Sequence, residues 1–270
     1  MTALESWLDH PAVQAAGLPF IVALIVTLPL ARTRWLALAQ IAGFVACATL
    51  VAGWSLESLT STRKLAIIGV ASIILCVIVE TWAAHARATV VASLALAFAA
   101  LWMAWRVLAQ KEPGPAIVAG VLAFGYVALQ CAMTLRAGED PVRAISSATV
   151  LALTSGIVGV LGASAVLGSL AIAAGASAGA TLAYLWMRNL VPPRGRSLAL
   201  PASAIAALVG VAAVLVADLP AYCLAPLLLV TPAARFAPAL RPMRTRAVIA
   251  FASAIIPAAA AIALAWFRPA

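Results

Sequence analysis

The stretch that decides the fold is Ala144–Met187, AISSATVLALTSGIVGVLGASAVLGSLAIAAGASAGATLAYLWM, which contains no Asp, Glu, Lys, Arg or His. It is roughly 44 residues long, and about 20 apolar residues suffice to span a bilayer as a helix. The stretch therefore predicts two transmembrane helices, 144–161 and 165–187, joined by a short turn near Gly162-Ala163-Ser164. We expect this hairpin to form the tightly packed centre of a helical membrane bundle.

Small residues recur along both helices of the hairpin. Apolar side chains gain little by leaving lipid tails, so membrane helices associate where small residues let their backbones approach closely. Three glycines follow one another at every third position, and GASAG at 175–179 is a small-xxx-small pair. The pattern predicts helix packing through Gly156, Gly159, Gly162, Gly168, Gly175 and Gly179. The alternative is that the missing side chains open a narrow path for a substrate.

The composition of the whole chain agrees with a membrane location. The 270 residues are 66% hydrophobic and only 9% charged, with a mean hydropathy of +1.12. A soluble domain has about 45–50% apolar and about 25% charged residues. Because one soluble core cannot bury this excess, we predict an all-α polytopic bundle, a single integral membrane domain covering 1–270 and surrounded by the lipid bilayer. A β-barrel would show short alternating strands instead.

Ten apolar runs divide the chain into predicted spans. They cover about 13–31, 35–54, 65–82, 88–108, 116–135, 144–161, 165–187, 198–216, 219–234 and 247–267. The ninth is short for a span and contains Pro226, so a thin, kinked helix and a re-entrant helix are both open. Residues 2–10 predict a short amphipathic segment on the membrane surface. Five spans in each half would also permit two halves of inverted topology.

The distribution of basic residues predicts the orientation. A net charge of +9 could indicate a nucleic-acid ligand, but the basic residues are scattered over short loops, so we expect no nucleic-acid partner. One set of loops holds Arg32, Arg34, Arg87, Arg136, Arg143, Arg188, Arg194, Arg196, Arg235, Arg241, Arg244 and Arg246, and the other holds Arg63, Lys64, Arg106, Lys111 and Arg268. Lys and Arg accumulate in cytoplasmic loops, so the first set should be cytoplasmic, with both termini periplasmic, in a bacterial inner membrane. A re-entrant ninth segment would leave the cluster at 235–246 outside, against this rule.

Few polar residues lie inside the predicted spans. An ionisable side chain in a bilayer is costly and therefore marks a functional candidate. Glu80 and Arg106 are such candidates, although each lies near a span end, where snorkelling to the interface would also explain it. A predicted substrate path comprises Gln40, Glu80, Gln130, Thr154 and Ser155. For the two glutamines the alternative is a hydrogen bond between helices.

Signatures of catalysis are missing from the sequence. It contains no HExxH zinc motif, no GxSxG elbow and no P-loop. Its two histidines, His10 and His85, are expected outside the hydrocarbon. The four cysteines lie singly in apolar runs, which favours small packing residues over a metal site or a disulfide. We therefore predict no catalytic residues, no metal, no cofactor and no enzyme activity.

Several short motifs support a loose family resemblance. They are HPAVQ at 10–14, GLPF at 17–20, LTSTRKL at 59–65, and GASA at 162–165 with GA at 175–176. With these motifs and its richness in Ala, Arg and Leu, the chain resembles uncharacterised multi-pass inner-membrane proteins of GC-rich bacteria. This resemblance implies a location and no activity. The length and span number are also similar to those of the drug/metabolite transporter superfamily, but no residue-level motif is shared and the outside N-terminus departs from its plan.

Two functions follow from these features. The first is permease-like transport of a small solute or lipid-like molecule by alternating access, which the ten spans and the prolines at 226 and 257 favour. The second is a non-catalytic membrane subunit or assembly factor that packs against a partner protein or a second copy through Gly/Ala-rich helix faces, which the scarcity of buried charge favours. A third hypothesis, a membrane enzyme acting on lipid, has weaker support from the sequence. A polar cavity reaching the midplane would support transport, and a solid bundle with a bare Gly/Ala face would support a subunit.

Overall fold

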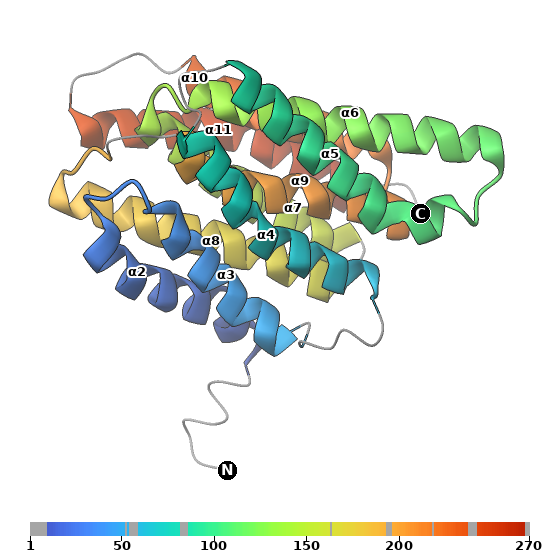
Figure 1. Cartoon of the computed structure of the whole chain (residues 1–270), viewed down its shortest axis with the longest axis horizontal. Helices are drawn as coiled ribbons and strands as arrows, with labels where there is room; N and C mark the ends of the chain where they lie inside the picture. Colours follow the sequence, from blue (N-terminus) through green and yellow to red (C-terminus); the bar gives the residue numbers. More distant parts are fainter. Residues whose placement is uncertain are drawn as a thin grey trace, which may run out of the picture.

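The computed structural model describes residues 10–51, 53, 59–81, 86–162, 164–192, 196–217, 219–236 and 242–267. Over these ranges the chain folds into helices without a strand, which confirms the all-α prediction (Figure 1). The helices are η1 (Val13–Gly17), α2 (Leu18–Leu30), α3 (Ala37–Val51), α4 (Ser61–Thr81), α5 (Ala86–Leu108), α6 (Pro113–Ala137), α7 (Pro141–Gly162), α8 (Ala165–Arg188), α9 (Arg196–Val216), η2 (Ala221–Cys223), α10 (Leu224–Arg235) and α11 (Met243–Trp266). Apart from His10, the predicted surface segment 2–10 lies outside the described residues.

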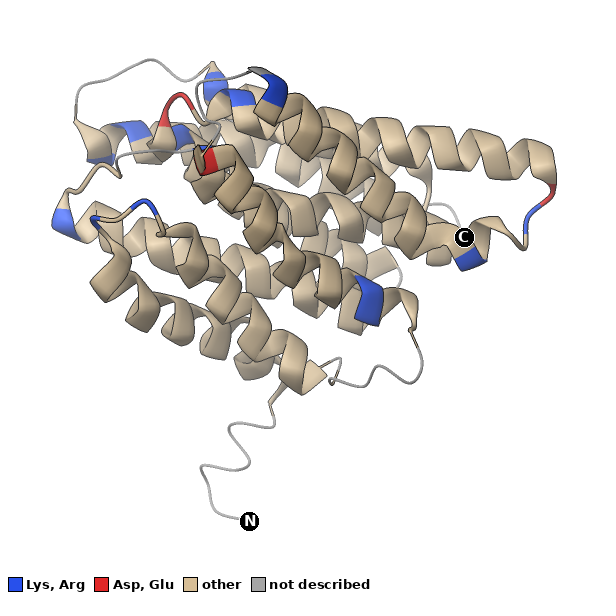
Figure 2. Cartoon of the chain, in the orientation of Figure 1, with Lys and Arg blue, Asp and Glu red and all other residues tan. Residues whose placement is uncertain are grey.

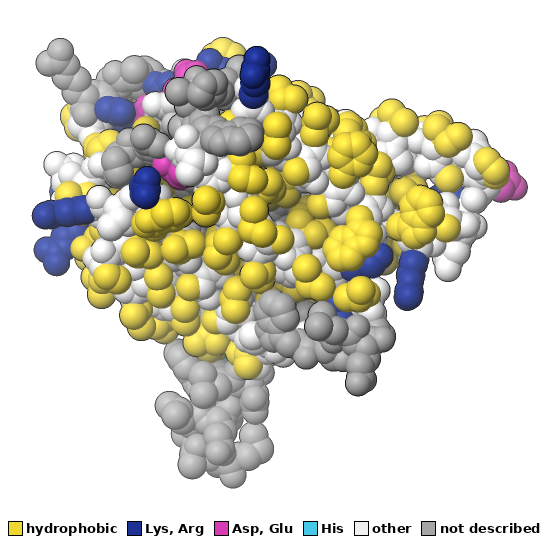
Figure 3. Space-filling model, in the orientation of Figure 1, with side chains coloured by type: hydrophobic (Ala, Val, Ile, Leu, Met, Phe, Trp, Pro, Cys, Tyr) yellow, Lys and Arg dark blue, Asp and Glu magenta, His cyan; other side chains and the backbone are white. Residues whose placement is uncertain are grey.

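Eight helical segments in the described ranges are long and apolar enough to cross a membrane, with η1 and α2 counted together. This agrees with a multi-pass membrane protein. Helices α3 and α10 are shorter, with 15 and 12 residues. Every predicted span overlaps a helix. The number of spans that cross the bilayer and the inverted halves stay predictions. Figure 3 shows hydrophobic side chains over most of the visible face, as lipid contact requires.

Several helices extend beyond the apolar windows because polar residues form their ends. Helix α7 begins at Pro141 since the Asp140 side chain accepts from the backbone N–H of Val142 at its start. Helix α4 includes Lys64, which is buried, donates to the Trp102 carbonyl at 2.9 Å and lies over that indole ring. A hydropathy pattern does not detect these helix ends. Their charged side chains stay close to the bundle because local contacts stabilise them.

The centre of the bundle is formed by α7, α8 and α9. In the most apolar window of α9, 89% of the residues are buried, compared with 78% for α7 and 61% for α8. For α6 and α11 the share is 28%. Figure 1 shows α7 and α9 enclosed by the other helices. The predicted hairpin therefore lies in the interior, but the most buried helix is the one that follows it.

Glycines determine how closely α7 and α8 approach. A Cβ on Gly156 would lie 2.8 Å from the Ile172 nitrogen and 2.9 Å from the Gly168 oxygen. A Cβ on Gly168 would lie 2.8 Å from the Val160 nitrogen, and one on Gly159 would lie 3.3 Å from the Gly168 Cα. These neighbours are backbone atoms that cannot rotate away, so the two helices are in direct backbone contact.

The remaining glycines of the predicted packing set differ in how much space surrounds them. A Cβ on Gly175 would lie 2.8 Å from the Leu153 nitrogen, and Gly162 faces the side chain of Leu219. At Gly179 the first atom met is Thr149 Cγ2, at an ordinary contact distance of 3.5 Å. Packing between α7 and α8 therefore requires glycine at 175 but leaves room at 179.

Candidate functional site

The structure buries all five residues of the predicted path. Their exposed fractions are 1% for Gln40, 6% for Glu80, 0% for Gln130, 4% for Thr154 and 1% for Ser155. They lie on four helices, namely α3, α4, α6 and, for the last two residues, α7. Their partners show which of them the fold brings together.

Gln40 and Glu80 converge on the first turn of α9. Gln40 Nε2 donates to the Leu198 carbonyl oxygen at 2.7 Å, and the Ser197 hydroxyl donates to Glu80 Oε1. Both bonds join residues more than 100 positions apart in the chain. The fold thus places a buried amide and a buried carboxyl group beside adjacent residues of one helix end.

A proline explains a third contact at this helix end. Pro201 lies inside α9 and has no N–H, so the carbonyl four residues earlier loses its helical donor. That carbonyl belongs to Ser197, and the Cys76 thiol donates to it at 3.5 Å. A buried carbonyl without a partner is costly. The Cys76 thiol of α4 therefore replaces the hydrogen-bond donor that Pro201 lacks. The sequence shows Pro201 and Cys76 but gives no signal that they meet.

Gln130 has a different set of partners. Its Nε2 donates to Thr231 Oγ1 of α10 at 3.1 Å, and its backbone oxygen accepts from Thr134 Oγ1 at 2.9 Å. This is the interhelical bond that the sequence left open as an alternative. Among the described residues, buried polar atoms without a hydrogen-bond partner include Gln40 Oε1, Gln130 Oε1 and Ser155 Oγ.

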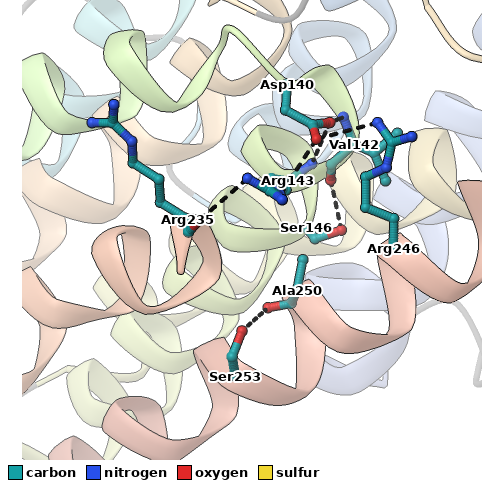
Figure 4. A network of polar contacts seen from close by, with 8 residues as sticks. All are labelled: Asp140, Val142, Arg143, Ser146, Arg235, Arg246, Ala250 and Ser253. Carbon is teal, nitrogen blue, oxygen red and sulfur yellow. Dashed lines mark hydrogen bonds and ion pairs between the residues drawn. The ribbon is translucent and has the colours of Figure 1, made fainter. Parts of the chain in front are cut away.

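A charged network joins three helices at the arginine-rich end (Figure 4). Asp140 Oδ1 accepts from the N–H groups of Val142 and Arg143 at 3.1 and 3.4 Å, and Oδ2 lies 3.2 Å from Arg246 Nη1. Arg143 Nη1 donates to the Arg235 carbonyl oxygen at 3.2 Å. The start of α7, the end of α10 and the start of α11 are therefore fastened together. Figure 2 shows basic segments gathered at this end and fewer at the opposite one.

An apolar groove of about 540 Å³ opens on the outer surface between α8 and α11. Gly175, Ala176 and Gly179 line it from α8, and Phe251 and Ile255 line it from α11. Apart from Thr149 on α7, its lining side chains are apolar or absent. The groove therefore offers shape and backbone proximity rather than polar recognition.

Other cavities also lie on the described surface. One of about 490 Å³ lies between α6 and α9, and one of about 590 Å³ lies beside η1. The third, of about 520 Å³, lies at the arginine-rich end and includes Arg32, Tyr184 and Arg188. None of these four cavities is lined by a residue of the predicted path.

The described ranges contain no group of three or more His, Cys, Asp and Glu side chains able to hold an ion. Cys47, Cys76, Cys131 and Cys223 are all buried and free. His85 lies outside the described residues.

Comparison of the chain with protein-family models, with curated proteins and with solved structures finds no match. Function is therefore inferred from the geometry of the chain itself.

Proposed function

We propose that this chain is a non-catalytic membrane subunit that holds a transmembrane helix of a partner protein in the groove between α8 and α11. The observation that carries the proposal is the 540 Å³ groove lined by Gly175, Ala176 and Gly179. Small residues expose the helix backbone, and close backbone approach is what stabilises helix association in lipid. On the facing side, Ala247 and Ala252 of α11 leave the same kind of surface.

The dimensions of the groove fit a helix. On α8 its lining residues run from Gly175 to Trp186. At 1.5 Å rise per residue this is about 16 Å, or roughly three helical turns. Gly179 is also the glycine that α7 and α8 do not need, because its nearest neighbour would be at 3.5 Å. A partner helix packed against α8 would explain the glycine at position 179, which the packing of α7 against α8 does not.

The predicted substrate path supports a subunit more than a permease. Its side chains are buried, and Gln40, Glu80 and Gln130 each bond to a neighbouring helix. Such bonds hold a bundle together. The four cavities described above are lined by other residues, which also supports a subunit.

The test is a photo-crosslinking amino acid placed at Ala183, inside the groove, in native membranes. Val121 of α6, which is 65% exposed and outside the groove, is the matched control position. We expect one protein adduct of constant mass from position 183 and lipid adducts alone from 121. Gly179→Leu should abolish the protein adduct because its side chain fills the groove. A product of two chains would identify the partner as a second copy.

Two results would contradict this proposal. One is lipid adducts alone at both positions. The other is a protein adduct that persists in a folded Gly179→Leu variant, because the crosslink would then report a neighbour outside the groove. The thermal midpoint of each purified variant shows whether it is folded.

Permease-like transport is the second candidate, and a specific observation favours it. Gln40 Oε1, Gln130 Oε1 and Ser155 Oγ lack hydrogen-bond partners among the described residues, and Glu80 is a buried carboxyl group. Buried polar atoms of this kind accept hydrogen bonds from water or a substrate when a path opens. Access of water to Thr154, near the middle of α7, is the result that would favour transport.

The proposed topology has ten spans, with the arginine-rich end in the cytoplasm of a bacterium. The segment 219–235 supports this count. Leu219 lies against Gly162 at the end of α7, whereas the Arg235 carbonyl accepts from Arg143 at its start. A segment that connects the two ends of a buried transmembrane helix crosses the bundle instead of turning back.

A further inference from the structure

A polar cavity lies where α2 and α8 end side by side. Its volume is about 520 Å³, and its lining residues are Leu28, Pro29, Ala31, Arg32, Tyr184, Arg188 and Leu190. Thr27 Oγ1 of α2 lies 3.4 Å from Thr181 Oγ1 of α8, about one turn before the cavity. Helices α2 and α8 both run from this contact toward the cavity, so the C-terminal ends of two parallel helices lie at its mouth.

The cavity carries positive charge without an acidic partner. Arg32 and Arg188 are exposed, and within the described residues neither forms an ion pair. The Arg188 guanidinium lies 6.0 Å from the centre of the Tyr184 ring. Each helix C-terminus contributes about −0.5 charge, and Arg244 also donates to the Trp186 and Met187 carbonyls at the end of α8. The guanidinium groups therefore leave a net positive charge at the mouth, which suits an anion.

The chemistry of the lining narrows the class of anion. Guanidinium groups bind phosphate through paired N–H donors, and the Tyr184 hydroxyl is a further donor. Leu28, Pro29 and Leu190 form apolar walls beside these donors. A polar mouth next to apolar walls at the end of a transmembrane helix pair suits a molecule with a charged head and an apolar body. Basic pockets between such helices bind anionic lipid head groups.

We propose that this cavity binds the phosphate group of an anionic phospholipid, with Arg32 and Arg188 as its ligands. The site does not depend on the partner-helix groove. Tyr184 and Arg188 are four residues apart and share one face of α8, whereas Gly179 and Ala183 share another. Either site can exist without the other.

The test is native mass spectrometry of the full-length protein with phosphatidylglycerol or phosphatidylcholine of the same acyl chains. We expect the wild type to prefer phosphatidylglycerol. A basic residue near a membrane surface is worth about 1 kcal/mol, which is about 5-fold in affinity. The double variant Arg32→Gln/Arg188→Gln should therefore bind phosphatidylglycerol roughly 25-fold more weakly. The control Arg106→Gln/Lys111→Gln removes the same charge from other helix ends and should retain the preference.

A second pair of variants keeps the test valid if the double variant does not fold. Leu28 lines the cavity and is 54% exposed, so its replacement leaves the core intact. Leu28→Glu should expel phosphatidylglycerol by like-charge repulsion, and Leu28→Gln should not. Equal binding of the two lipids by the wild type, or equal losses in the cavity and control variants, would overturn the proposal. Binding of inorganic phosphate by a wild type that shows no preference between the two lipids would show that a free anion is the ligand.

Discussion

At the residue scale, a missing Cβ decides the distance between the two helices at the centre of the bundle. Gly156 and Gly168 place backbone against backbone, and an added Cβ would lie within 3.0 Å of peptide atoms as well as of side-chain atoms. Such positions cannot accept even one methyl group without moving a helix. Gly125 on α6 has no atom within 4 Å of its ideal Cβ position. Glycine is therefore required at 156, whereas at 125 it only lowers the stability of the helix.

We predict that Gly156→Ala destabilises the protein by about 1–3 kcal/mol, the usual cost of overpacking. Its Cβ would lie 2.8 Å from the Ile172 nitrogen. The matched control Gly125→Ala should be neutral or stabilise by up to about 1 kcal/mol, because Ala favours helix over Gly. The free energy of unfolding in mixed micelles measures both. Equal effects at the two positions would contradict the close contact between α7 and α8.

At the element scale, the helix ends are joined by side chains from distant parts of the sequence. The first turn of α9 receives Gln40 from α3 at the Leu198 carbonyl and Cys76 from α4 at the Ser197 carbonyl. Pro201 removes the backbone donor of the Ser197 carbonyl. At the arginine-rich end, Asp140 caps α7 and at the same time pairs with Arg246 of α11 (Figure 4). One side chain therefore sets where α7 begins and where α11 docks.

Two substitutions of Asp140 separate these roles. Asp140→Ala removes the cap, worth about 1 kcal/mol, and the ion pairs, worth about 0.2–1 kcal/mol. Asp140→Asn keeps a good capping residue and should lose only the ion-pair part. The exposed neighbour Glu139 supplies the control Glu139→Gln, which should leave stability unchanged. The same unfolding measurement orders the variants, and an Asn variant as unstable as the Ala variant would show that the ion pairs carry the whole effect.

At the scale of the whole molecule, the sequence predicts the class of structure well and its interior less well. Long apolar runs fix helices in all ten expected places, because only a helix satisfies its own backbone in lipid. The burial of α9 could not be predicted, since lipid-facing and protein-facing helices are equally apolar. The partners of Gln40 and Glu80 were also beyond prediction, because Ser197 and Leu198 lie more than 100 residues away.

A cysteine-accessibility scan tests both the topology and the packed interior. Single cysteines would replace Glu139, Phe236, Lys111 and Thr154 on a background without the four native cysteines. If α10 crosses the bundle, an impermeant thiol reagent reaches 139 and 236 from the cytoplasmic side and 111 from the opposite side. The expected side follows from the Arg143–Arg235 contact, which places the end of α10 beside the start of α7.

Position 154 decides between the two candidate functions in the same experiment. Thr154 is 4% exposed and near the middle of α7, so a packed subunit leaves its cysteine unlabelled from both sides. Buried polar atoms such as Ser155 Oγ would gain hydrogen-bond partners if a water-filled path opened beside them. Labelling at 154 would therefore exclude the packed interior on which the subunit proposal depends and favour transport. Labelling confined to the three loop positions would support the proposal that the groove between α8 and α11 holds a partner helix.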